Sequence, residues 1–376
     1  MSLPRITFGI IVLNGEPFLR YNLRALYPFA HQIIVAEGAS PKAAHVATDD
    51  GHSIDTTLAT LRQFQAEEDS EQKLVIVTAE DEGHPNGFWP GEKDQQSQAY
   101  AKRATGDWLW QIDIDEFYDP EDMQRICRLL LADPDLTCLT FNARHFWGGF
   151  DYVVEGGLFI NHNFQGEPWG AYRRLFRWKP GYQYLTHRPP TLGDATGRDI
   201  TSQKKRNLTR EPYERPVVMH HYTAVFPHQV LPKGAYYAGL GQTTVREKFE
   251  RFSARLDQQS AIKIYDHYGT NNWLQRFTGS HPPAIVQLRN DIANGRVAID
   301  LRQTDDIEQV LAAPRYQALI AALRRAEWLR ERGNIFKRQV WTGSMRLLGR
   351  ILPAALVRRI PGRIGARLAR EQKAGA

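Results

Sequence analysis

Three carboxylates follow an apolar run in the first third of the chain. Residues 108–112 read Trp-Leu-Trp-Gln-Ile, and Asp113, Ile114, Asp115 and Glu116 come directly after them. On an extended backbone, side chains two residues apart share a face, so we expect Asp113 and Asp115 to point together while Ile114 turns into the core. Mg²⁺ or Mn²⁺ suits such a pair, because these ions take one or two protein carboxylates and complete their coordination with phosphate oxygens and water. The sequence therefore predicts a divalent-cation site here.

The alternative interpretation of this cluster is a solvated acidic turn. Asp119-Pro120-Glu121 follows closely and is typical of a helix N-terminus, with Asp119 as the capping residue. Capping accounts for Asp119 alone. The three preceding acids would still lie against an apolar strand and repel one another without a cation.

The cluster closes a segment in which short apolar runs alternate with helical patterns. The strand-like runs are residues 6–13, 32–35, 74–77 and 108–112, and the helical patterns are residues 18–27, 58–64 and 96–104. This alternation predicts an α/β fold, with a mostly parallel sheet and helices on both faces. In such sheets ligands bind beyond the carboxyl ends of the strands. Those ends are polar or small here: Asn14-Gly15-Glu16, Glu37-Gly38, Glu80-Asp81 and the cluster from Asp113.

The rest of the chain has a weaker pattern. A helix is expected at residues 120–131 and a strand at 138–146, and residues 147–232 are rich in aromatic residues, Gly and Pro, which indicates loops and short strands. Helical patterns return at residues 245–259, 283–294 and 315–332. We therefore divide the chain into residues 1–118, residues 119–300, and a helical, basic extension over residues 301–376.

Composition excludes several classes of protein. The chain has 376 residues, of which 42% are hydrophobic, enough to bury a large core. Its net charge of +6 is concentrated at one end, because ten Lys and Arg residues from Lys337 onward face the single acid Glu371, and the remainder is slightly acidic. A nucleic-acid-binding protein would carry its basic residues around one binding surface, so we expect no nucleic-acid partner.

The two cysteines and the N-terminus indicate where the protein works. Cys127 and Cys138 form no CxxC pair and cannot hold zinc by themselves, which is typical of buried thiols in a reducing compartment. The apolar run at residues 6–13 is too short to span a bilayer and lacks a basic segment before it and a cleavage site after it. A cytoplasmic protein is therefore expected.

Two motifs resemble those of family 2 glycosyltransferases, which have the GT-A fold. Residues 104–108, Ala-Thr-Gly-Asp-Trp, and the Asp-x-Asp-Glu run behind them resemble that family's A-x-G-[ED]-aromatic and D-x-D segment, and residues 14–19 resemble its first-strand N-x-E-x-x-L. The resemblance is good over residues 5–118 and patchy to about residue 240. The D-x-D-E-[FR] ending is most similar to the subset that acts on bacterial lipopolysaccharide core and cell-surface glycans.

This resemblance implies a reaction and its partners. A sugar would pass from a nucleoside-diphosphate donor to a glycan or lipid-linked acceptor, with inversion and with Mn²⁺ or Mg²⁺ as cofactor. Residues 1–118 would bind the donor and residues 119–300 the acceptor. The donor-binding residues would be Asn14, Glu16, Glu37 (where the family usually has Asp), Asp81, Asp113, and Lys93, which would supply the positive charge that relatives often carry where Gln98 stands here.

The resemblance also points to ligands and a base in the second half. Many GT-A enzymes add a third metal or diphosphate ligand at a strand end such as His220-His221, so the metal ligands would be Asp113, Asp115 and one of these histidines. Because consecutive strand residues point to opposite faces, only one histidine can face the site. Arg188 stands where the family carries its usual acid, which leaves Asp194, Glu167 and Glu155 as alternatives for the general base.

Two other functions remain open. A sugar-phosphate nucleotidyltransferase shares this topology and metal chemistry, but it generally carries a Gly-rich phosphate loop, which Asn14-Gly15-Glu16 is not. A degenerate GT-A domain that only binds is favoured by the missing acid at Arg188 and the neutral Gln98.

The basic end of the chain suggests a further partner. Apolar residues alternate there with arginines over residues 338–352 and 356–368, in helical pieces that we expect to be broken at Pro353 and Pro361. Such pieces can lie in a membrane interface with arginines at headgroup level. The sequence therefore predicts an anionic membrane surface as a partner, with the protein peripheral on the inner face.

Overall fold

The computed structural model describes residues 3–91, 93–156, 163–164, 167–168, 171–208, 216–230, 243–252, 264, 272–351, 353–357 and 368. The chain divides into two compact units, Met1–Tyr316 and Gln317–Ala376. All the predicted site residues belong to the first unit. The division of that unit into donor and acceptor halves stays a prediction.

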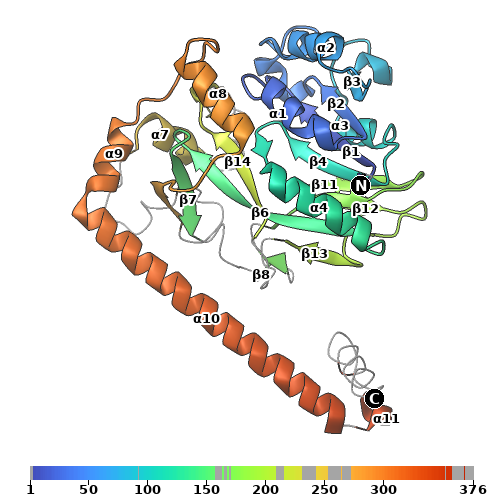
Figure 1. Ribbon diagram of the computed structural model, residues 1–376, viewed down its shortest axis with the longest axis vertical. Coiled ribbons are helices and arrows are strands. Elements are labelled where there is room, and N and C mark those ends of the chain that lie inside the picture. Colours follow the sequence, from blue (N-terminus) through green and yellow to red (C-terminus); the bar gives the residue numbers. More distant parts are fainter. Residues whose placement is uncertain are drawn as a thin grey trace. The chain divides into compact units, whose positions relative to one another are not determined.

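The first unit is built on a mixed sheet of eleven strands (Figure 1). At one side of it, four strands run parallel in the order β3-β2-β1-β4, which confirms the predicted parallel arrangement. These strands are β1 (Ile6–Val12), β2 (Gln32–Glu37), β3 (Leu74–Val77) and β4 (Trp108–Asp113).

Beyond β4 the strands run in both directions. β10 (Ala171–Arg177) is antiparallel to β4 and to β6 (Cys138–Trp147), and β14 (Val218–Ala224) is parallel to β6. The other strands of this sheet are β5 (Glu116–Phe117), β7 (Tyr152–Gly156), β13 (Lys205–Asn207) and β15 (Asn272–Arg276). Two separate hairpins pair β11 (Gln183–His187) with β12 (Pro190–Gly193), and β8 (Asn163–Phe164) with β9 (Glu167–Pro168).

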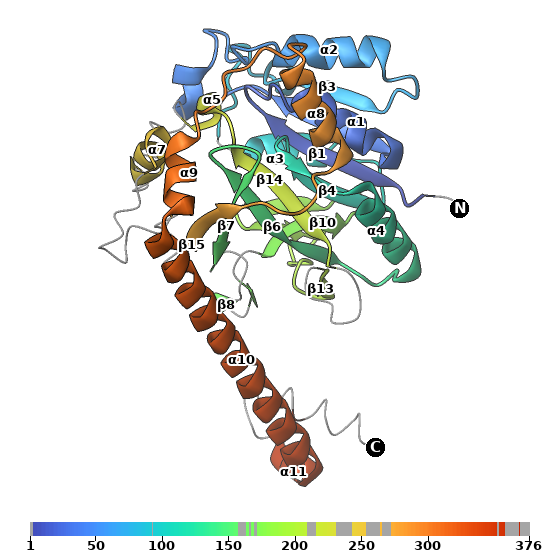
Figure 2. The ribbon, with the colours of Figure 1, turned by 60° about the vertical axis from the view of Figure 1, so that its left-hand side comes forward.

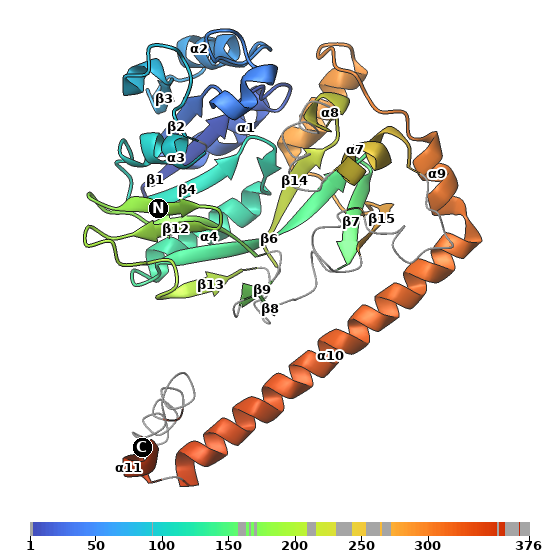
Figure 3. The same ribbon diagram turned by 180° about the vertical axis from the view of Figure 1, so that it is seen from behind.

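The parallel strands are mostly apolar because both of their faces are buried. In β2, Ile33 and Val35 join one core, whereas Ile34 and Ala36 join the core on the opposite face. The first core is covered by helices α1 (Leu19–Leu26), α2 (Thr57–Glu67) and α4 (Pro120–Ala132). The second is covered by α3 (Lys93–Ala101), which lies beside the β11–β12 hairpin (Figure 3).

Four more helices and three 3₁₀ turns belong to the described part of the first unit. α8 packs on α1 (Figure 2), and Tyr21 of α1 donates a hydrogen bond to Asp291 of α8 over 2.8 Å. The bounds are α5 (Pro227–Val230), α7 (Thr243–Glu250), α8 (Pro283–Ala293) and α9 (Asp305–Ala312), with 3₁₀ turns η1 (Tyr27–Phe29), η2 (Pro41–Val46) and η3 (Glu80–Glu82). The predicted helix at 245–259 ends at Glu250, and residues 253–259 lie outside the described residues.

The second unit consists mainly of one helix. The predicted C-terminal end of the helix at 315–332 is wrong, because α10 (Pro314–Ile351) continues through Gly333. A single glycine costs a helix about 1 kcal/mol but does not stop it, whereas Pro353 does. α11 (Ala354–Val357) follows. No helix within the described residues is long and apolar enough to cross a membrane.

The strand order places a switch point between β1 and β4. From β1 the chain moves outward to β2 and β3, then returns to the other side of β1 with β4. Loops that leave the two central strands therefore diverge and open a crevice at their carboxyl ends, where open α/β sheets bind ligands. Asn14 follows β1 and Asp113 ends β4 at this crevice.

Candidate active site

The acidic cluster lies on a turn. β4 ends at Asp113, the chain turns at Ile114 and Asp115, and β5 begins at Glu116. The expectation that Asp113 and Asp115 share one face of an extended strand is therefore wrong. The turn is held by Asn22, whose Nδ2 donates hydrogen bonds to the carbonyl oxygens of Ile114 and Glu116 over 3.1 and 2.8 Å.

Arg174 neutralises part of the cluster. Its Nη2 donates to Asp113 Oδ2 over 3.0 Å and to a carboxylate oxygen of Glu116. Arg174 is 4% exposed and Glu116 is fully buried, so the ion pair has little access to water. Arg174 is a site residue that no motif predicted, because β10 carries three arginines in seven residues and its sequence does not show which of them is buried.

Burial and Arg174 act on these acids in opposite directions. Burial tends to raise the pKa of Asp113, but Arg174, Lys93 and His221 outweigh it and hold that pKa well below its usual range. Burial raises the pKa of Glu116 to about 7, although Arg174 opposes it. Asp113 is thus the ionised member that faces the cavity, and Glu116 is the buried support behind it.

The two histidines of β14 separate as strand alternation predicts. His221 lines the cavity, and its Nε2 lies 3.4 Å from Asp115 Oδ1. His220 points to the other face, where Arg144 Nη1 lies 3.2 Å from its Nε2. Burial tends to lower the pKa of His221, but Asp115, Glu116 and Asp113 raise it.

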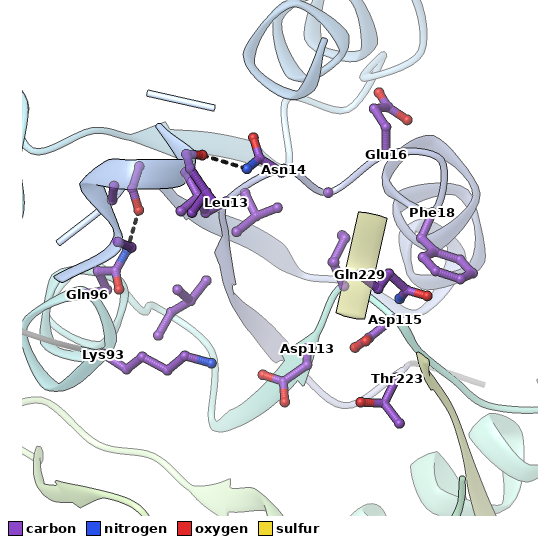
Figure 4. A pocket seen from close by; sticks show the side chains of 18 of the residues that line it. Leu13, Asn14, Glu16, Phe18, Lys93, Gln96, Asp113, Asp115, Thr223 and Gln229 are labelled. Atoms are coloured by element: carbon purple, nitrogen blue, oxygen red, sulfur yellow. Dashed lines mark hydrogen bonds between the residues drawn. The ribbon is translucent and has the colours of Figure 1, made fainter. Parts of the chain in front are cut away.

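A cavity of about 300 Å³ opens at the switch point (Figure 4). Its wall is formed by the ends of β1 and β4, the turn after β2, the start of α3 and the end of β14. The predicted site residues that line it are Asn14, Glu16, Lys93, Asp113, Asp115 and His221. Figure 4 shows the ammonium group of Lys93 directed toward the side of the cavity where Asp113 lies.

Lys93 is placed where a phosphate group is favoured. It is the first residue of α3, and backbone N–H groups at a helix N-terminus attract anions. Its charge also helps to hold the pKa of Asp113 down. The cavity thus combines the ionised carboxylate of Asp113 with the positive charge of Lys93.

A divalent cation fits the donor set of this cavity. Oxygen atoms of Asp113 and Glu116 and a ring nitrogen of His221 all lie within 4.8 Å of one another, and Asp115 lines the same wall. Arg174 supplies one buried positive charge against the three acids. In addition, His221 Nδ1 is buried and has no hydrogen-bond partner among the described residues. Hard oxygen ligands with one imidazole suit Mn²⁺ or Mg²⁺.

Asn14 and Glu16 fasten a loop. Asn14 takes the left-handed conformation (φ 55°), which asparagine tolerates, and its side chain bonds the Val46 carbonyl and the Ile54 N–H over 2.7 and 2.8 Å. Glu16 Oε1 accepts a hydrogen bond from the Thr60 hydroxyl over 2.5 Å. Both residues line the cavity, but these side-chain hydrogen bonds are to residues between β2 and the middle of α2.

The carboxylate of Glu37 is covered by the loop that follows β2. It is fully buried, and its carboxylate accepts hydrogen bonds from Ser53 N and Oγ, both over 2.8 Å, while His52 Nδ1 lies 2.8 Å away. Glu37 does not line the cavity. The predicted contact between Glu37 and a nucleoside would therefore require this segment to open.

Asp81, Asp194 and Glu155 do not line the cavity. Asp81 Oδ2 accepts hydrogen bonds from Thr78 in the turn before η3. Asp194 accepts them from Thr196 and Arg198, and these bonds lower its pKa. Glu155 interacts electrostatically with Arg144, whose guanidinium lies beside His220, on the side of β14 that faces away from the cavity. The side chain of Glu167, in β9, lies outside the described residues.

No protein-family model matches the chain, and no curated protein matches its sequence. Among solved structures it is similar to TarS 1–349 of S. aureus, with a TM-score of 0.33 and 8% identity over 65% of each chain. In the UDP-GlcNAc complex of TarS the TM-score is 0.29, with 11% identity over 46% of this chain and 45% of that one.

A third similar structure is glucosyl-3-phosphoglycerate synthase from Mycobacterium tuberculosis, in complex with Mn²⁺, UDP-glucose and phosphoglyceric acid. The TM-score is 0.26 and the identity 16%, over 39% of this chain and 45% of that one. The chain therefore spans less than two thirds of the length of each of these three structures.

Proposed function

We propose that the cavity binds the diphosphate of a nucleotide sugar and that the protein is a glycosyltransferase of the GT-A type, from family 2. The observation that carries the proposal is the convergence of Lys93, Asp113 and His221 on one cavity at the switch point of the sheet. The sequence motifs at residues 14–19 and 104–116 support the same function. A cationic helix N-terminus beside acids is what a metal-bound diphosphate needs.

The roles of the residues follow from their placement. Asp113, Asp115 and His221 would hold Mn²⁺ or Mg²⁺, which neutralises the charge of a departing nucleoside diphosphate. Lys93 would bind the diphosphate directly. Arg174 keeps Asp113 ionised and oriented from behind, so its part in the reaction is positioning.

The acceptor side of the proposal rests on the sequence. We propose an inverting transfer to a cell-surface glycan or a lipid-linked acceptor, as in the lipopolysaccharide-core subset. The acceptor hydroxyl then needs a carboxylate within hydrogen-bond reach. Of the predicted bases, Asp194 is engaged in its own turn and Glu155 lies on the other face, which leaves Glu167 as the first to test.

The proposal is tested by thermal shift with nucleoside diphosphates and nucleotide sugars, with and without Mn²⁺. A ligand at about 100 times its Kd stabilises the folded state by about 2.7 kcal/mol, so the correct donor raises Tm. Asp113→Asn should abolish the metal-dependent part of the shift. Asp135→Asn is the matched control, since that side chain is 84% exposed and remote from the cavity lining. Equal shifts for both variants would contradict the assignment.

A binding module is the second candidate, because Arg174 already occupies one oxygen of Asp113. The distinguishing measurement is release of nucleoside diphosphate from the nucleotide sugar that gives the largest thermal shift. A shift without release, in the presence of Mn²⁺ and cell-envelope glycolipid, would favour the module over the enzyme.

A further inference from the structure

Helix α10 exposes large apolar side chains along one line. Leu329, Val340, Leu347 and Ile351 are 55%, 50%, 59% and 66% exposed. A helix turns by about 100° per residue, so these four positions fall within about 40° of one another around the axis. We call them the apolar stripe. Exposed apolar residues scattered singly need no explanation, but an aligned set indicates a binding surface.

The charges of α10 are arranged around this stripe. Arg325 and Arg332, both exposed, lie about 40° and 60° to one side of Leu329, and Arg350 occupies the same side. The acids within residues 317–351 are Glu327 and Glu331, and both positions are about 160° away from Leu329. Arginine positions therefore border the stripe, and the two acidic positions fall on the opposite side of the helix.

An aromatic residue lies at the same border. The guanidinium of Arg332 is 4.3 Å from the ring centroid of Trp328, which is 51% exposed. Tryptophan is enriched at membrane–water interfaces, and arginine can bury its stem while its charge stays at headgroup level. A stacked Trp–Arg pair beside an apolar stripe suits that boundary.

The arginines beside the apolar stripe distinguish between its possible binding partners. A second copy of α10 packed on the stripe would bring arginines against arginines without acids nearby, which is unfavourable. An anionic lipid surface receives the same arginines favourably. The helix is too polar to cross a bilayer. We propose that α10 lies in the interface of an anionic membrane, with the apolar stripe inserted and Arg325 and Arg332 among the headgroups.

The test is cosedimentation of the full-length protein with phosphatidylcholine vesicles, with and without about 30 mol% phosphatidylserine. The stripe variant is Val340→Gln/Leu347→Gln/Ile351→Gln, since glutamine preserves helix propensity. We expect its partition to anionic vesicles to fall at least about tenfold. The matched control makes the same changes at exposed apolar residues of the first unit, Leu131, Val286 and Leu301, and should bind as wild type.

A second pair of variants tests the charges. Arg325→Gln/Arg332→Gln removes two arginines beside the stripe, and Arg324→Gln/Arg338→Gln removes two that lie about 140° and 180° from Leu329. The first should weaken binding to anionic vesicles more than the second, and salt should reduce the difference.

Three results would overturn the proposal. Equal binding to vesicles with and without phosphatidylserine would remove the role of charge. A wild-type dimer that the stripe variant dissociates, measured by sedimentation velocity without lipid, would assign the stripe to a second copy. A lower Tm of the stripe variant with unchanged vesicle binding would assign it to packing within the chain. None of these results bears on the cavity in the first unit.

Discussion

A fully buried glutamate lies at the end of β2 and another directly after β4. Only beside the second does a neighbouring carboxylate, that of Asp113, line the cavity. Glu37 ends β2 and is bonded by Ser53 and His52, from the loop that follows it. Glu116 follows β4 and is bonded by Arg174, from a distant strand. At β2 the loop closes over the acid. At β4 the arginine belongs to β10 and does not line the cavity, whereas the neighbouring Asp113 does.

The difference shows what makes an acid at a strand end available to a ligand. The residue type is the same in both places, and so is the burial. What differs is the direction from which the protein satisfies the carboxylate. An acid satisfied from the loop side is structural, whereas one supported from the core side leaves its neighbour free to bind.

The largest expected effect is on the β4 side of this comparison. Arg174→Met leaves Glu116 and Asp113 without their buried counter-charge, and removing one partner of a buried pair typically costs about 3–5 kcal/mol. The free energy of unfolding from urea titration should fall by that amount. Glu116→Gln/Arg174→Met should recover part of the loss. A loss below about 1 kcal/mol would mean that Arg174 is not the support described here.

Asp113→Asn should separate function from stability. Because Asp113 faces the cavity, we expect the nucleotide-sugar-dependent activity to fall about 10²–10³-fold, as for loss of one transition-state-stabilising group. Its Tm should fall less than that of Arg174→Met, because Arg174 keeps its bond to Glu116, and Asp135→Asn should melt as wild type. Turnover near the wild-type level, at matched Mn²⁺ concentration, would place the metal elsewhere.

Glu37→Gln should show the reverse pattern. Loss of charged hydrogen bonds to Ser53 and His52 should lower the free energy of unfolding by about 1–3 kcal/mol. Turnover per folded molecule should change little at a temperature where the variant remains folded. If turnover falls as far as in Asp113→Asn, with stability unchanged, Glu37 binds the donor and the loop opens during the reaction.

The smallest effect is a pH dependence at the β2 end. Burial tends to lower the pKa of His52, but Glu37 and Glu80 raise it above 6.5. A raised folded-state pKa stabilises the protein fully below the unfolded-state value, and this contribution is lost as pH rises through the folded-state value. The difference in free energy of unfolding between wild type and His52→Gln, expected to be below about 1 kcal/mol, should therefore shrink as pH increases from 6. A constant difference from pH 6 to about pH 9 would contradict it.

The sequence predicted the parallel half of the sheet because its information is local. Apolar runs of strand length alternating with helical patterns specify β1 to β4, and the polar ends of those strands specify the edge where a ligand binds. The grouping of Asn14, Glu16, Lys93, Asp113, Asp115 and His221 around one cavity follows from that order.

The geometry of the site depends on hydrogen bonds between residues far apart in the sequence, and a local sequence pattern cannot predict such contacts. Asn22 holds the turn at Ile114 from 92 residues away, and Arg174 reaches Asp113 across 61 residues. The burial of Glu37 was not predictable for another reason. The acid itself is typical of a donor contact, but the loop that occupies it has no strand or helix pattern to announce where it folds.

Part of the cavity wall is formed by the loop after β2 and not by the strands themselves. Ala39, Ala43 and His45 line the cavity, and hydrogen bonds to Asn14 and Glu37 hold the loop at the two strand ends, with a further backbone bond from Trp89 to Ala39. We therefore expect that the sequence between Glu37 and Ser53 can be replaced while the strands stay intact. Loops of other lengths between these two residues would test whether this segment selects the proposed donor.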